Sequence, residues 1–149
     1  MDNINIADEF LIRIKNIQDS LAQVVTIHLF TEYWLDKILY SQCNEPDALP
    51  RQLNYKNKLA IVHSLVKLPS GLYDNLSKLN KLRNQCAHNL KFDFDRADYS
   101  YDMSSIDWND SAPLSEWAER ERVIWIGMVT FGWLHNYSYD ELNLLDGDI

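Results

Sequence analysis

Apolar side chains recur at three- and four-residue intervals through residues 4–41, the spacing that gathers side chains on one face of an α-helix. No proline or glycine interrupts this stretch. The pattern predicts either one long helix or two helices separated by a bend near Asp19 and Ser20, because either side chain can cap a new helix. Glu32 falls on or near the apolar stripe, so we expect it either to bind a partner or to reach water from the edge of the stripe.

A loop and a second helical region follow. Pro46 and Pro50 place a loop over residues 43–51, and apolar periodicity then predicts a helix over residues 54–68. His63 lies beside the apolar face of that helix, where a lone histidine is more often structural than a ligand.

The next helix is predicted over residues 71–88, after a turn in which Ser70 is the expected N-cap. Its inward stripe consists of Leu72, Leu76, Leu79, Leu82 and Cys86. The helix therefore packs along its length, and its C-terminal end carries Arg83, Asn84 and His88.

Residues 89–112 have no helical period and are predicted to form a structured connecting segment, with a short helical turn at residues 94–97. The segment is rich in aspartate and aromatic residues. Asp93 and Asp95 suggest metal ligands, but the glycine and closing glutamate of an EF-hand loop are absent, so no metal is expected there.

The last helix is predicted to begin at Ser111-Ala112-Pro113 and to run to about residue 136. Residues 123–134 are apolar nearly all round, which predicts a place at the centre of a bundle or in a subunit interface. Gly127 and Gly132 are expected to allow close approach of neighbouring helices. The acidic residues 137–149 are expected to form a frayed tail.

Composition fits one helix-rich globular domain over residues 1–149, because glycine and proline number only four each. Cys43 and Cys86 do not make a disulfide framework and are typical of a reducing cytoplasm. The N-terminus lacks the basic stretch of a signal peptide, and the longest apolar run is too short to span a bilayer. We therefore expect a cytoplasmic protein without a membrane segment.

The net charge of −8 argues at first against a nucleic-acid partner. The charge is unevenly distributed, however. Residues 48–92 hold eight basic side chains and one acidic side chain, a balance of +7, whereas the rest of the chain carries −15. This segment either forms a local anion-attracting surface or only keeps two helices soluble.

No glycine-rich phosphate loop, zinc-ligand spacing, nucleophile elbow or paired-carboxylate signature appears, so no cofactor or metal is expected. What remains is Arg83 and His88, which lie about 140° apart around a helix axis. Arginine binds anionic oxygens and histidine moves protons near neutral pH, so the pair suits RNA transesterification. By spacing alone, a histidine that contacts carbonyls at the helix end is the simpler explanation.

The segment Arg83-Asn84-Gln85-Cys86-Ala87-His88 resembles the R-N-x-x-A-H form of the R-x4–6-H motif of the HEPN superfamily. The surroundings agree with that family over about residues 20–95, with Glu32 in the first helical segment and Leu-Asn-Lys-Leu leading into the motif. The Phe-Asp-Phe-Asp run at residues 92–95 resembles the mannitol-repressor-like branch.

This resemblance implies an all-α, up-down bundle of four to five helices that forms a homodimer, with the motifs of two subunits facing one groove. It implies a metal-independent endoribonuclease acting on RNA, often in toxin–antitoxin or antiphage systems, with an antitoxin or regulatory protein as a further partner. Arg83 and His88 would be catalytic, and Asn84 would position them. Glu32 would orient Arg83. Leu90 stands where some of these toxins carry a modified tyrosine, so AMPylation is not expected at this site.

The alternative is a non-catalytic regulatory or protein-interaction module resembling the mannitol repressor. The net acidity and the apolar last helix favour it, and Arg83 and His88 would then stabilise a dimer or a partner interface. Direct operator DNA binding is the least favoured function, because no recognition helix with clustered basic and amide residues is evident.

Overall fold

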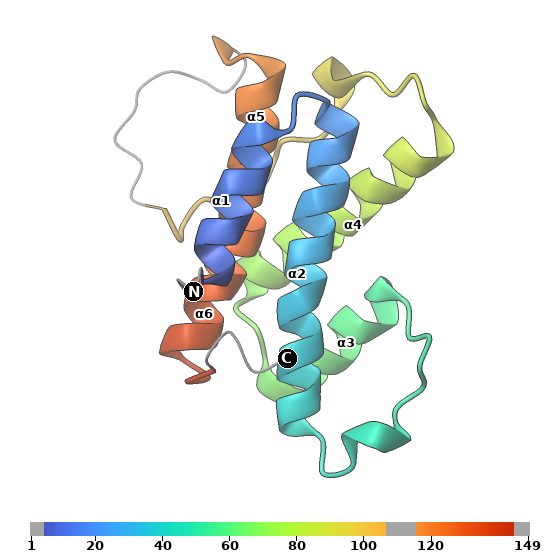
Figure 1. Cartoon of the computed structure of the whole chain (residues 1–149), viewed down its shortest axis with the longest axis vertical. Helices are drawn as coiled ribbons and strands as arrows, with labels where there is room; N and C mark the ends of the chain where they lie inside the picture. The colour runs from blue at the N-terminus through green and yellow to red at the C-terminus, as the bar shows by residue number, and fades with distance from the viewer. Residues whose placement is uncertain (1–4, 107–115, 145–149) are drawn as a thin grey trace.

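The computed structural model describes residues 5–106 and 116–144, and the regular structure within these ranges is entirely helical (Figure 1). The all-α bundle predicted from the sequence is therefore confirmed. The elements are α1 (Ile6–Asn16), α2 (Ser20–Gln42), η1 (Pro46–Ala48), α3 (Tyr55–Val66), α4 (Ser70–His88), η2 (Phe94–Arg96), α5 (Glu119–Gly127), η4 (Met128–Gly132) and α6 (Trp133–Asp140).

The first helical region is two helices rather than one. α1 ends at Asn16, and α2 begins at Ser20 after a short bend. Asp19 caps α2, because its side chain accepts a hydrogen bond from the backbone N–H of Ala22 at 3.0 Å. Of the two alternatives left by the sequence, the two-helix arrangement is confirmed.

α2 is the central helix, since α1, α3, α4, α5 and α6 all pack against it (Figure 1). Trp34 and Leu35 on α2 are fully buried. Midway along α2, three aromatic rings pack together in the core: Phe10 lies 4.3 Å from Phe131 and 5.3 Å from Phe30, measured between ring centroids. These contacts hold α1 and the C-terminal helices on the same side of α2.

α3 and α4 form the part of the bundle that carries the motif. Asn54 caps α3 by accepting a hydrogen bond from the backbone N–H of Asn57 at 2.8 Å. α4 begins at Ser70, so the expectation that Ser70 is the N-cap was wrong. Pro69 takes that place, because its carbonyl already accepts the first helical hydrogen bond, from the N–H of Tyr73 at 3.0 Å. The predicted inward stripe of α4 is buried throughout.

Within residues 89–106, the described part of the predicted connecting segment, the backbone is irregular apart from η2, which confirms the helical turn expected near residues 94–97. Asn75, fully buried in α4, fixes this segment in place. Its side chain exchanges two hydrogen bonds with the backbone of Asp102, at 2.8 and 2.9 Å, and donates a third to the carbonyl of Val129 at 2.9 Å. One side chain thus joins α4, the connecting segment and η4.

The C-terminal region differs from the expected single helix. The expected start at residues 111–113 lies outside the described residues, and residues 116–118 are not α-helical. A π-helical turn, η4, separates α5 from α6. The helix continues to Asp140, so the expectation of a frayed tail from residue 137 was wrong for its first part. Buried Ser138 explains this, because its hydroxyl bonds the carbonyl of Leu134 and its own carbonyl accepts from Leu144.

Across the described ranges, every helix is too short or too polar to be a candidate for crossing a membrane.

Candidate functional site

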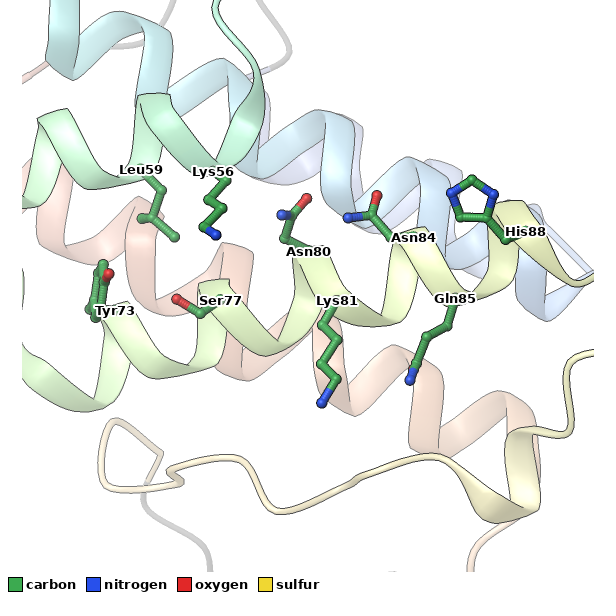
Figure 2. Close-up of a pocket in the computed structure, with 9 residues that line it drawn as sticks. All are labelled: Lys56, Leu59, Tyr73, Ser77, Asn80, Lys81, Asn84, Gln85 and His88. Atoms are coloured by element: carbon green, nitrogen blue, oxygen red, sulfur yellow. The ribbon is translucent and has the colours of Figure 1, made fainter.

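A groove of about 540 Å³ runs along the outward face of α4, with α3 along one side (Figure 2). We call it the α3/α4 groove. It is lined by Lys56, Leu59, Tyr73, Ser77, Asn80, Lys81, Asn84, Gln85 and His88. The members from α4 recur at three- and four-residue intervals, which places them on one helix face. Within the described part of the chain, no carboxylate lines this groove.

Two asparagines in the groove have their amide oxygens occupied by neighbouring side chains. Asn80 Oδ1 lies 3.0 Å from His28 Nε2, and Asn84 Oδ1 accepts a hydrogen bond from Arg83 Nη1 at 3.4 Å. The donors of an asparagine side chain are on its nitrogen, so each amide nitrogen remains available to a ligand. Together with the two lysines of the lining, the groove offers positive charge and hydrogen-bond donors. Most of the groove surface is nevertheless apolar, so it suits a ligand that has an apolar or aromatic part beside its anionic or carbonyl oxygens.

His28 supports the groove from inside the bundle. Its side chain is only 8% exposed and stacks on Tyr55 of α3, with ring centroids 4.0 Å apart. Because an amide oxygen can only accept, the contact with Asn80 requires the proton on Nε2. Burial is the main cause that lowers the pKa of His28, and the positive charges of Arg83 and Lys58 act in the same direction. The hydrogen bond that His28 donates to Asn80 and the charge of Glu32 oppose the shift.

The structure places Asn84 and His88 on one face of α4 and Arg83 on another. His88 is exposed at the last position of the helix and lines the end of the groove. Asn84 lines the groove one turn earlier (Figure 2). Arg83 is half-buried and is not part of the lining; its charge acts on His28 of α2. The angular separation predicted for Arg83 and His88 therefore persists, and a single chain does not bring the two side chains together in this groove.

Glu32 has a different partner from the one expected. Its carboxylate lies 3.4 Å from the ammonium of Lys58, and Asp36 lies 2.7 Å from the same ammonium. Among the described residues, Glu32 forms no ion pair with Arg83. The Glu32 side chain is also 30% exposed, so it both has a partner and reaches water. Its contacts connect α2 to α3 rather than to the motif.

Only some of the basic side chains of residues 48–92 line the α3/α4 groove. Lys56 and Lys81 line the α3/α4 groove. Lys58 is buried and paired with two carboxylates, and Lys78 donates to the carbonyl and hydroxyl oxygens of Ser100. A smaller side pocket of about 160 Å³ adjoins the groove and shares Lys81 and Gln85 with it. The positive charge of the groove therefore comes from one lysine on α3 and one on α4.

Sequence reasoning missed several residues that form this site. Tyr73 lines the end of the groove farthest from His88 and stacks on His63, with ring centroids 4.2 Å apart. The polar spacing of the outer face of α4 was visible in the sequence, but the same spacing is typical of any solvated helix face. The contact between His28 and Asn80 could not be inferred from any local sequence pattern, because the two residues are 52 positions apart.

Within residues 5–106 and 116–144, no three metal-binding side chains lie together. Comparison of the chain with protein-family models, curated proteins and solved structures gave no match.

Proposed function

We propose that this chain is a HEPN-type, metal-independent endoribonuclease that cleaves RNA as a homodimer. The observation that carries the proposal is the position of His88 at the end of a groove whose described lining includes two lysines and several amide donors and no carboxylate. A titratable imidazole beside an anion-binding surface is the arrangement that phosphodiester cleavage without a metal requires. The resemblance of the motif to the HEPN superfamily supports the same function.

In the proposed reaction, an imidazole accepts the proton of a ribose 2′-hydroxyl, and the 2′-oxygen attacks the adjacent phosphorus. The bond from phosphorus to the 5′-oxygen breaks, a 2′,3′-cyclic phosphate forms, and the leaving 5′-oxygen takes up a proton. Arg83 would stabilise the extra charge on the phosphorane-like transition state. Because Arg83 and His88 project from different sides of α4, two motifs facing one another supply these groups better than one.

A ribonuclease inside a cell needs control, so we propose a role as a toxin or antiphage component that a partner protein restrains. An antitoxin that covers the α3/α4 groove would block RNA and His88 together. This proposal adds a protein partner to the RNA substrate.

The test is cleavage of a labelled RNA by the purified protein in the presence of EDTA. Replacing His88 with alanine should lower the rate by about 100-fold or more, because general acid–base catalysis contributes roughly 10²–10⁴-fold. His88 is exposed, so this variant should fold normally. Lys91→Ala is the matched control, since Lys91 is also exposed and lies just beyond α4. If His88→Ala cleaves as fast as wild type, the catalytic proposal is wrong.

A second candidate function is a non-catalytic regulatory or protein-interaction module resembling the mannitol repressor. It is favoured by the position of Arg83, which lies outside the groove and acts on buried His28. Thermal unfolding of Arg83→Ala separates the two functions. A large loss of stability without any change in RNA cleavage indicates a structural arginine, whereas lost cleavage at unchanged stability indicates catalysis.

A further inference from the structure

The side chains that line the α3/α4 groove differ in chemistry from one end to the other. At one end lies His88, and at the other lies the aromatic ring of Tyr73 (Figure 2). Fifteen helical positions separate them, or about 22 Å at the helical rise of 1.5 Å per residue. Between them lie the ammonium group of Lys81 and the amides of Asn80 and Asn84. The groove thus joins a proton-transfer group, a row of donors and an aromatic platform.

From this arrangement, we infer that the α3/α4 groove binds single-stranded RNA along α4, with phosphates on Lys56 and Lys81 and one base stacked on Tyr73. The inference rests on the proposed ribonuclease function and specifies its substrate and its binding residues. It makes Tyr73 a specificity-determining residue that selects an unpaired base at a fixed distance from the scissile bond near His88.

The size of the groove favours a single strand over a duplex. Its volume of about 540 Å³ lies within the roughly 300–1,000 Å³ of pockets that hold one small ligand. Such a space receives one or two bases turned out from a longer strand, whereas duplex RNA is recognised over a much longer and flatter surface. A length of about 22 Å corresponds to a short strand, near the lower end of the roughly 4–16 nucleotides that single-strand sites cover.

Tyr73 is already prepared for stacking. His63 stacks on Tyr73 with an interplanar angle of 20°, so the ring is held in one orientation before a base arrives. Base stacking on an aromatic side chain tolerates every base, because each base has a π face. The hydrogen-bond donors of Asn80 and Asn84 can then read carbonyl oxygens on base edges or contact phosphate oxygens.

Binding is measured by fluorescence anisotropy with a labelled 2′-O-methyl oligouridine of about 12 nucleotides, a length within the range of single-strand sites. The missing 2′-hydroxyl prevents cleavage, so binding is separated from catalysis. We expect Lys81→Gln to weaken binding and to reduce the slope of log affinity against log salt by about 0.7, the value for one phosphate contact on a single strand. Lys15→Gln removes the same charge from exposed Lys15 at the end of α1 and should leave both quantities unchanged.

The aromatic platform is tested with Tyr73→Leu and Tyr73→Phe. The leucine variant should bind the oligouridine about 5- to 150-fold more weakly, the range expected for one lost base stack, whereas phenylalanine should bind like tyrosine. Because Tyr73 is half-buried, circular dichroism must show that both variants are folded. The same oligouridine annealed to its complement and a polyglutamate peptide are the competing ligands, and both should bind more weakly.

Several outcomes overturn the inference. They are equal affinity for the duplex or the peptide, unchanged binding by Tyr73→Leu, an equal effect of Lys15→Gln and Lys81→Gln, or no binding of the oligouridine. The proposed function fails separately. If groove variants lose binding but His88→Ala cleaves RNA as fast as wild type, the groove binds RNA and His88 is not catalytic. If His88→Ala loses cleavage but groove variants bind normally, the protein is a ribonuclease and RNA does not bind along the α3/α4 groove.

Discussion

His28 is the residue that joins the core of the bundle to the proposed site. It stacks on Tyr55, and the hydroxyl of Tyr55 lies 2.8 Å from Thr31 on α2. The other side of the imidazole holds the amide of Asn80 in the groove. A substrate that bonds to Asn80 would thus contact a side chain whose orientation is fixed by buried groups, which reduces the entropy lost on binding.

The lowered pKa of His28 predicts a pH-dependent stability. Below the ordinary histidine pKa of 6.5, the unfolded chain binds a proton at His28 before the folded chain does. The free energy of unfolding should therefore fall as the pH drops from about 7 to about 5, by at most about 1.4 kcal/mol per pH unit from this group. His28→Gln keeps a donor for Asn80 but does not titrate. Its free energy of unfolding, measured with urea, should therefore change less with pH over this range. Equal slopes for the two proteins would contradict the prediction.

Asn75 is a second residue whose role only the three-dimensional structure reveals. Asn75→Ala leaves both backbone groups of Asp102 and the carbonyl of Val129 without this partner. Buried polar groups without partners are costly, so we expect the free energy of unfolding to fall by about 2–4 kcal/mol. Asn57→Ala, at an exposed position on α3, is the control and should change it by less than about 0.5 kcal/mol. Similar urea midpoints for the two variants would show that Asn75 is dispensable.

At the scale of elements, replacing either of two glycines near the junction of α5 and α6 with alanine should have opposite effects on stability. A Cβ at Gly127 would lie 2.8 Å from the ring of Phe10, which confirms that this glycine allows close helix approach. At Gly132 the nearest atom would be 4.0 Å away, so the same expectation was wrong there. Gly127→Ala should lower the free energy of unfolding by about 1–3 kcal/mol through overpacking. Gly132→Ala should raise it by about 0.4–1 kcal/mol by restricting the unfolded chain. Chemical denaturation measures both, and shifts of the same sign would refute the packing argument.

Helices were predictable from the sequence where one face is apolar and a turn bounds the segment. The expected helices over residues 54–68 and 71–88 correspond to α3 and α4 within two residues at each end. The last helix was harder to predict, because a segment that is apolar nearly all round does not show which face is buried. The π-helical turn η4 could therefore not be inferred from it. The position of His88 at the end of α4 was predictable, whereas the partner of Glu32 was not. That partner, Lys58, lies on another helix, and only tertiary packing brings the two together.

For the whole molecule, the distribution of charge matters more than its sum. The net charge is −8, yet the α3/α4 groove has no carboxylate among its described lining residues. If the proposed function holds, acidic side chains elsewhere would repel RNA and the lysines of the groove would attract it. This distribution favours binding at one place rather than broad adhesion to nucleic acid.

The proposed reaction is carried out by a homodimer, and the exposed face of α2 predicts where the two copies meet. Val25 and Leu29 lie one turn apart on that face and are 36% and 58% exposed, next to the His28–Asn80 contact that connects α2 to α4. Leu29→Glu would bury a charge in such an interface, so sedimentation velocity should show a shift from dimer to monomer, accompanied by loss of RNA cleavage. Leu65→Glu is the matched control, because Leu65 is 47% exposed on α3 and should leave the dimer intact. A wild-type monomer that cleaves RNA would show that one motif is sufficient, and a dimeric Leu29→Glu variant would place the interface elsewhere.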